Sequence, residues 1–206
     1  MRKKAKAKAG VEKSASAPSF NVGWFEGIAI LGSHPATVGM APFNDKWKIY
    51  ACSPHNFEQR RLPRIDEWFE VHKPIADSTR AYPYLKYVET LPFVWMRDED
   101  AMPHFPGARR YPEKEMKERF GPFCFTSTIA YMLARAIEDC EENDIPAIGL
   151  FGVMQSHPNE YAYQRPGIQN LIWEATRPDR EKFGLKRLSV IAPDISRLFE
   201  PQPDQF

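Results

Sequence analysis

The chain has 206 residues, of which 43% are apolar and 13% aromatic, enough for a sizeable core in one domain of ordinary size. This composition excludes disorder over most of the length. The formal charge of +1 is uneven, because residues 1–19 hold six cations and one carboxylate, a net of +5, which leaves about −4 for residues 20–206.

These charges predict three segments: a disordered basic arm at residues 1–19, a single domain at residues 20–199 and a polar tail at residues 200–206. The arm lacks the apolar stretch of a secretory signal, and no run approaches the roughly 18 apolar residues that span a bilayer. Three cysteines without metal-binding spacing are expected to be buried free thiols. We therefore expect a cytoplasmic protein that makes no membrane contact.

Apolar runs and helical patterns alternate along the domain. Buried strands are predicted at residues 27–32, 47–53, 92–96, 145–153 and 187–193, and residues 67–72 are either a strand or a short helix that leads into one. Helices are predicted at residues 82–91, 112–121, 126–143 and 165–176. In the helix at 126–143, a Thr/Ser cluster should form the N-cap and the acidic residues near the end should face outward. The alternation predicts an α/β fold, a Rossmann-like three-layer sandwich with a mostly parallel sheet.

Ligands of open parallel sheets bind beyond the carboxyl ends of the strands, and four of the five histidines follow predicted strands. After the first strand, Gly32, Ser33 and Thr37 could hold a phosphate beside a helix N-terminus. A Gly-Ser pair is also an ordinary turn. After the second strand, His55 and Asn56 could hydrogen-bond a base or a ribose, although Asn is equally a common turn residue.

Charged residues follow the next predicted strands. His72 comes two residues after Glu70, so the two side chains are expected to share a strand face, where the carboxylate could orient the imidazole as a general base. A structural histidine is the alternative. The acidic residues 98–100 could hold Mg²⁺ or form a solvated loop. Arg109 and Arg110 could clamp a phosphate or lie on a surface loop.

A long polar and aromatic stretch, residues 156–167, runs into the helix predicted at 165–176. Gln164 and Arg165 would lie near the helix start, where an anion is favoured. Tyr163 could stack on a ligand, and His157 is a second candidate general base. The chain carries no complete zinc-protease or serine-hydrolase motif.

The chain resembles a group of small Rossmann-like proteins of tailed phages, mostly of unassigned function, in the succession ILGSHPATVGMAPFNDKWKIYACSPHN, RIDEWFEVH, FTSTIAYMLARAIE, IGLFGV and NEYAYQRPG. More distantly, it is similar to archaeal 6-hydroxymethylpterin diphosphokinase-like proteins and to bacterial sialyltransferases. The resemblance implies a nucleotide ligand at the mouth of the sheet, with Gly32, Ser33, Asn56 and Gly152 at matching positions. Met154 stands where such proteins often carry an acidic residue.

We therefore expect a protein that binds a nucleotide or nucleotide sugar and transfers a group from it, in the host cytoplasm if it is phage-encoded. Arg165 would offset negative charge and His72 or His157 would act as general base, while a need for Mg²⁺ stays open. One alternative is a non-catalytic binder of a nucleotide or a nucleotide-derived signal. Another is an interaction protein whose basic arm binds nucleic acid. The oligomeric state is open.

Overall fold

The computed structural model describes residues 25–53, 56, 62–72, 78–97, 99, 102–154, 163–194 and 197–199. Within them lies one sheet of seven strands in the order β5-β4-β3-β2-β1-β6-β7, and every pairing is parallel. The strands are β1 (Gly27–Leu31), β2 (Trp47–Cys52), β3 (Glu67–Glu70), β4 (Val94–Met96), β5 (Ala108–Arg110), β6 (Ala147–Phe151) and β7 (Ser189–Ile191). The predicted α/β class is confirmed.

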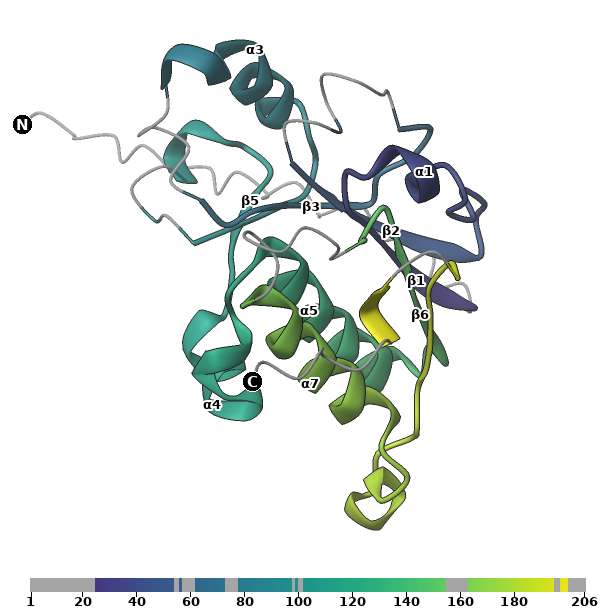
Figure 1. Cartoon of the computed structure of the whole chain (residues 1–206). Coiled ribbons are helices and arrows are strands. Elements are labelled where there is room, and N and C mark those ends of the chain that lie inside the picture. Colours follow the sequence, from purple (N-terminus) through teal and green to yellow (C-terminus); the bar gives the residue numbers. More distant parts are fainter. Residues whose placement is uncertain are drawn as a thin grey trace, which may run out of the picture.

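Helices cover both faces of the sheet (Figure 1). One face carries α1 (Pro35–Val38) and α3 (Ser78–Glu89); the other carries α4 (Glu113–Phe120), α5 (Thr128–Asn143) and α7 (Gln164–Thr176). Short 3-10 turns connect them: η1 (Met102–His104), η2 (Pro122–Cys124), η3 (Arg180–Phe183) and η4 (Arg197–Phe199). No helix among the residues described is long and apolar enough to cross a membrane.

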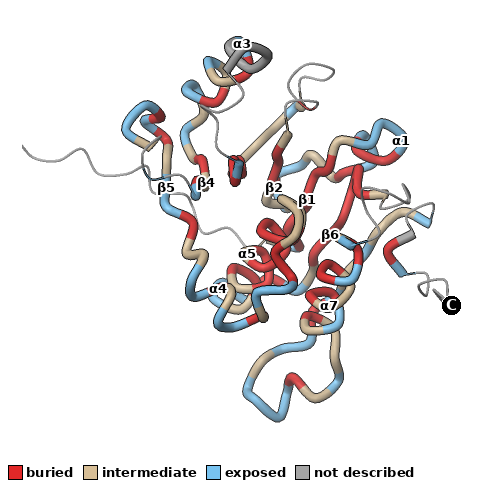
Figure 2. The backbone as a smooth tube through the Cα atoms, turned by 60° about the vertical axis from the view of Figure 1, so that its left-hand side comes forward, coloured by how far each residue is buried: buried red, intermediate tan, exposed pale blue. Residues whose placement is uncertain are grey.

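Successive side chains of the central strands point to opposite faces of the sheet, so the interior contains two apolar cores. In β1, Ile28 and Ile30 pack with α5 and α7, while Ala29 and Leu31 pack with α1 and α3 on the opposite face. Strands β1, β2 and β6 are therefore buried along most of their length, as Figure 2 shows. Burial on both faces explains why these strands are almost continuous apolar runs in the sequence.

Most of the predicted elements are present, with shifted ends. The stretch 67–72 contains a strand, Glu67–Glu70, and the helix predicted at 82–91 begins earlier, at Ser78, and contains Pro83. Ser127 is the N-cap of α5, since its side chain accepts a hydrogen bond from the Ala130 N–H. All three cysteines are free and buried.

Two expectations about local structure are wrong. The acidic side chains at the end of α5 do not all face outward, because Asp139 is only 2% exposed. Residues 108–110 form the edge strand β5 and not a surface loop, while the phosphate clamp stays a prediction. The guanidinium of Arg109 packs over the Phe93 ring, and Arg110 pairs with Glu99 at 2.9 Å.

Candidate functional site

The strand order reverses at β1, and this reversal locates the candidate site. From β1 the chain adds β2 to β5 on one side, then crosses to place β6 and β7 on the other. In open parallel sheets a crevice opens at such a switch point, beyond the carboxyl ends of the two strands that flank it. The segments of interest are therefore those that follow β1, β6 and β2.

The segments that follow β1 and β6 are joined by hydrogen bonds and approach each other closely. The Gly32 N–H donates to Phe151 O at 2.8 Å, and the His34 N–H donates to Gly152 O at 2.9 Å. A Cβ on Gly32 would lie 2.3 Å from Gly152 O. The buried hydroxyl of Thr37 accepts a hydrogen bond from the Gly152 N–H at 2.8 Å. Gly32 and Thr37 thus join two strand ends that are more than a hundred residues apart in the sequence.

Helix α1 has a single turn, and its first amides are already bonded. Pro35 has no N–H, and the Ala36 N–H donates to Nδ1 of the His34 side chain at 3.3 Å. The amides of Thr37 and Val38 donate to His34 O at 3.4 and 3.2 Å. The phosphate role predicted for Gly32, Ser33 and Thr37 therefore gains no support from this helix N-terminus. Ser33 lies half-buried beside it.

Asn56 closes the gap between the ends of β1 and β2. Its amide nitrogen donates to Cys52 O at 2.7 Å and to Gly32 O at 3.1 Å. Both partners are carbonyls, so the NH₂ group must face them, and the orientation of the amide follows from the network. Among the residues that the structure describes, none donates a hydrogen bond to the side-chain oxygen, which is buried in a residue that is 2% exposed. A buried acceptor without a donor costs about 1–3 kcal/mol, and a ligand that donates to this oxygen would remove that cost.

The backbone next to Asn56 is also unusual. Ser53 has φ of 82°, in the left-handed region that non-glycine residues rarely adopt, and its carbonyl accepts from the Asn56 N–H at 3.0 Å. Such conformations persist where the surrounding structure fixes them, and they gather at ligand sites. The left-handed backbone of Ser53 and the hydrogen bond that its carbonyl accepts therefore both constrain the position of Asn56.

At the end of β3, Glu70 and His72 are joined by a hydrogen bond from the His72 backbone and not from its imidazole. The His72 backbone N–H donates to Glu70 Oε1 at 3.2 Å, while the exposed ring of His72 lies 3.2 Å from Thr128 Oγ1 at the start of α5. The other oxygen of Glu70 accepts from the Tyr84 hydroxyl. Burial raises the pKa of Glu70, and the Tyr84 hydrogen bond opposes this shift. The hydrogen bonds of the Glu70 carboxylate thus come from the Tyr84 hydroxyl and the His72 backbone and not from the His72 ring.

The start of α5 carries the partial positive charge of a 16-residue helix toward His72. Arg97, which follows β4, lies on the same side: its guanidinium contacts Val71 O at 3.4 Å and stacks over the Tyr131 ring at 5.0 Å. Glu113 anchors this guanidinium at 2.7 Å. An imidazole, a guanidinium and a helix N-terminus thus converge at the ends of β3 and β4.

The other predicted residues lie at the start of α7 or outside the part described. Tyr163 is exposed, the Gln164 amide donates to its hydroxyl at 3.4 Å, and Arg165 is buried at the second position of the helix. His55, His157, Asp98 and Asp100 lie outside the described residues. Among the residues described, no group of three or more His, Cys, Asp or Glu side chains is placed to hold a metal ion.

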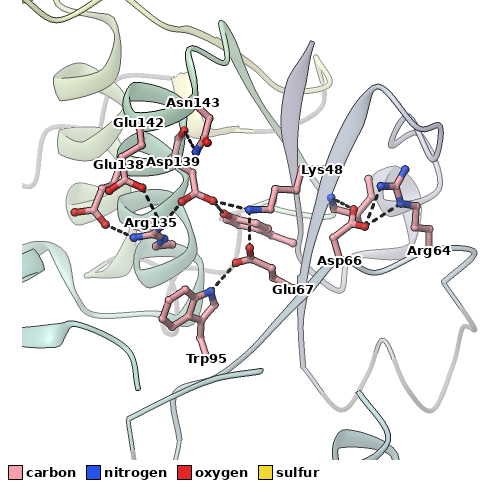
Figure 3. Close-up of polar contacts among 12 residues, drawn as sticks. Lys48, Arg64, Asp66, Glu67, Trp95, Arg135, Glu138, Asp139, Glu142 and Asn143 are labelled. Atoms are coloured by element: carbon pink, nitrogen blue, oxygen red, sulfur yellow. Dashed lines mark hydrogen bonds and ion pairs between the residues drawn. The ribbon is translucent and has the colours of Figure 1, made fainter. Parts of the chain in front are cut away.

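Sequence reasoning missed a buried ionic network at the opposite, amino end of the sheet (Figure 3). Lys48 of β2 pairs with Glu67 of β3 at 2.6 Å and with Asp139 of α5 at 2.7 Å. Asp139 also accepts from the Tyr50 hydroxyl and from Arg135. A lysine inside an apolar strand was the available signal, because such a residue requires a buried partner. This cluster lies away from the switch point, and its ion pairs are internal.

Comparison of the chain with protein-family models, with curated proteins and with solved structures finds no match.

Proposed function

We propose that the carboxyl edge of the sheet binds a nucleotide or a nucleotide sugar next to the β1–β6 switch point, where Asn56 bridges the ends of β1 and β2. The observation that carries this proposal is the unpaired oxygen of Asn56, which is buried where parallel sheets bind their ligands. An N–H of a base or a hydroxyl of a ribose supplies the missing donor. The fold supports this reading, as does the resemblance to small Rossmann-like phage proteins.

The phosphate end then lies along the edge, toward His72, Arg97 and the start of α5. The Arg97 guanidinium and the positive end of the α5 dipole favour a phosphate, and the His72 ring lies beside the start of α5. The phosphate role moves away from α1, whose amides are already bonded. If the protein is a transferase, the ring of His72 is the candidate general base, and Arg165 offsets the charge of the leaving group.

The non-catalytic alternative rests on a specific observation. Of the two titratable side chains at the end of β3, Glu70 is engaged by Tyr84, and the ring of His72 contacts the hydroxyl of Thr128. Binding of a nucleotide without turnover fits this arrangement equally well. Incubation with a bound nucleotide sugar, followed by chromatography of the nucleotide, separates the two: release of free nucleotide identifies a transferase or hydrolase.

The test of binding is a thermal-shift panel of nucleoside mono-, di- and triphosphates and nucleotide sugars, each with and without Mg²⁺. A ligand at 100 times its Kd adds about 2.7 kcal/mol of stability, or about 5–10 °C for a chain of this size. Ser33→Trp fills the mouth and should abolish the shift. Ser189→Trp, at an exposed serine of β7, is the matched control and should keep it. No shift with any member of the panel would refute the proposal.

A further inference from the structure

A second surface, at the opposite end of the molecule, exposes aromatic rings beside a basic turn. Trp173 near the end of α7 is 56% exposed and Phe183 in η3 is 66% exposed. The guanidinium of Arg177 lies 5.6 Å from the Trp173 ring centre and 5.0 Å from that of Phe183. The turn that carries η3 projects away from the sheet (Figure 1). Large exposed aromatic side chains held together in this way mark interaction surfaces.

Arg180, a buried cation within this turn, fixes the conformation of the turn. The Arg180 side chain donates to Lys186 O at 2.8 Å and to Glu174 O at 2.6 Å, which ties both ends of the turn to α7. Gly184 closes η3 with φ of 72°. Arg177 is fixed in turn by Glu174 at 3.0 Å and Asp179 at 2.7 Å. The rings and the guanidinium between them are therefore presented in a fixed arrangement, which lowers the entropy lost on binding.

The cations of this turn differ in whether carboxylates already engage them. Arg177, Arg180 and Lys186 are paired with Glu174, Glu141 and Asp144, so carboxylates from outside residues 177–188 offset much of the net charge of +3 within that range. Lys182 and Arg187 are exposed on the same turn. An anion with planar groups would use the charge and the ring faces together, whereas an acidic polypeptide would use the charge alone.

We propose that Trp173, Arg177 and Phe183 form a stacking platform for single-stranded nucleic acid. Unpaired bases stack on aromatic rings and on arginine planes, and the phosphates follow the nearby cations, which gives binding with little sequence preference. This surface is separate from the switch point, so the inference does not depend on the proposed nucleotide site. It also differs from binding through the basic arm, because it requires the two rings.

The test is fluorescence anisotropy with a labelled oligo(dT) of twenty nucleotides, using the full chain at low salt. Trp173→Ala and Phe183→Ala should each weaken binding by about 5- to 100-fold, since each stacked base contributes on this scale. Trp173→Phe keeps a ring and should retain most of the affinity. Phe123→Ala removes a side chain that is 63% exposed elsewhere and should bind as the original chain does. Melting temperatures close to that of the original chain show that each variant is folded.

Two further measurements test whether the basic arm takes part in binding and whether the ligand must carry bases. A full-length variant with Lys3, Lys4, Lys6 and Lys8 changed to Ala should keep its dependence on Trp173 and Phe183. Polyglutamate at equal charge concentration should compete poorly. The proposal fails if the original chain does not bind, or if both alanine variants bind equally well. It also fails if only the arm variant loses affinity, or if polyglutamate competes fully, which would indicate an acidic protein partner.

Discussion

Glycines at four positions provide a graded test of how the switch point is built. Replacement by alanine adds one Cβ at a defined place, and the surroundings differ in two respects only: whether φ is positive and whether space is free. Gly39 has helical φ of −72° and nothing within 4 Å of the added Cβ. Gly184 has φ of 72° and free space. Gly32 is crowded, and Gly152 is both crowded and left-handed, with φ of 69°.

The magnitudes follow from these surroundings. Gly39→Ala should gain about 0.4–1 kcal/mol, because alanine narrows the unfolded ensemble without strain. Gly184→Ala should lose about 1–2 kcal/mol to the left-handed backbone. In Gly32→Ala, the new Cβ at 2.3 Å from Gly152 O must move by about 1 Å to reach ordinary contact. This displacement weakens the backbone bonds to Phe151 and from Asn56. Overpacking and these bonds together amount to about 3–5 kcal/mol.

Gly152→Ala combines the clash with the left-handed strain and should lose about 4–7 kcal/mol, which approaches the whole stability of an ordinary domain. The assay is urea unfolding followed by circular dichroism, with the midpoint and slope compared across the four variants. From the most to the least stable variant, the expected order is Gly39→Ala, Gly184→Ala, Gly32→Ala and Gly152→Ala. A Gly32→Ala protein within 1 kcal/mol of Gly39→Ala would show that the β1–β6 contact is not the tight junction described above.

Three further predictions concern buried titratable groups. Asp139→Ala should cost about 3–5 kcal/mol in urea unfolding, because it removes one carboxylate partner from the half-buried Lys48 ammonium and one from the Arg135 guanidinium; a loss below 1 kcal/mol would contradict this. Burial raises the pKa of Glu70, so the folded state binds that proton more tightly and stability falls as pH rises above the usual glutamate pKa of about 4.3. The melting temperature of Glu70→Gln minus that of the original chain should therefore grow from pH 4 to pH 7, and a constant difference would refute the shift. Burial raises the thiol pKa of Cys52 and of Cys140 to about 12, so neither should react with a thiol reagent at pH 8 until urea unfolds the chain; rapid labelling in the native state would contradict their burial.

The parts of the fold that sequence predicts well are those with strong local patterns. Helix α5 shows apolar residues at helical spacing with a Ser N-cap, and β1 and β6 are almost continuous apolar runs. Strand β5 has no such pattern: Ala-Arg-Arg becomes a strand only because it pairs with Val94, Trp95 and Met96 of β4. A strand of this kind is defined by its neighbour, which a local pattern does not contain.

The candidate site divides in the same way. Position after a strand was enough to single out Asn56, because parallel strands bring their carboxyl ends to one edge. The sequence could not predict why a glycine is needed at position 32, because the Cβ of any other residue would clash with the backbone of Gly152, which is far along the chain. Asp139 was misjudged because a helical pattern treats an acidic residue as outward-facing. Only the tertiary structure shows the cations and the Tyr50 hydroxyl that surround it.

The two ends of the sheet treat buried polar groups differently, and this contrast supports the location of the binding site. At the amino end, Asp139 receives hydrogen bonds from three side chains. Arg135 Nε has no partner among the residues described, but it belongs to a guanidinium whose other nitrogens make ion pairs. At the carboxyl end, the unpaired Asn56 oxygen is the whole acceptor group of its side chain. Removing the side chain would relieve the cost, yet its NH₂ group is needed to join β1 to β2. A ligand that donates to this oxygen resolves the conflict without changing the fold, which is why the acceptor marks the end of the sheet where binding should be sought.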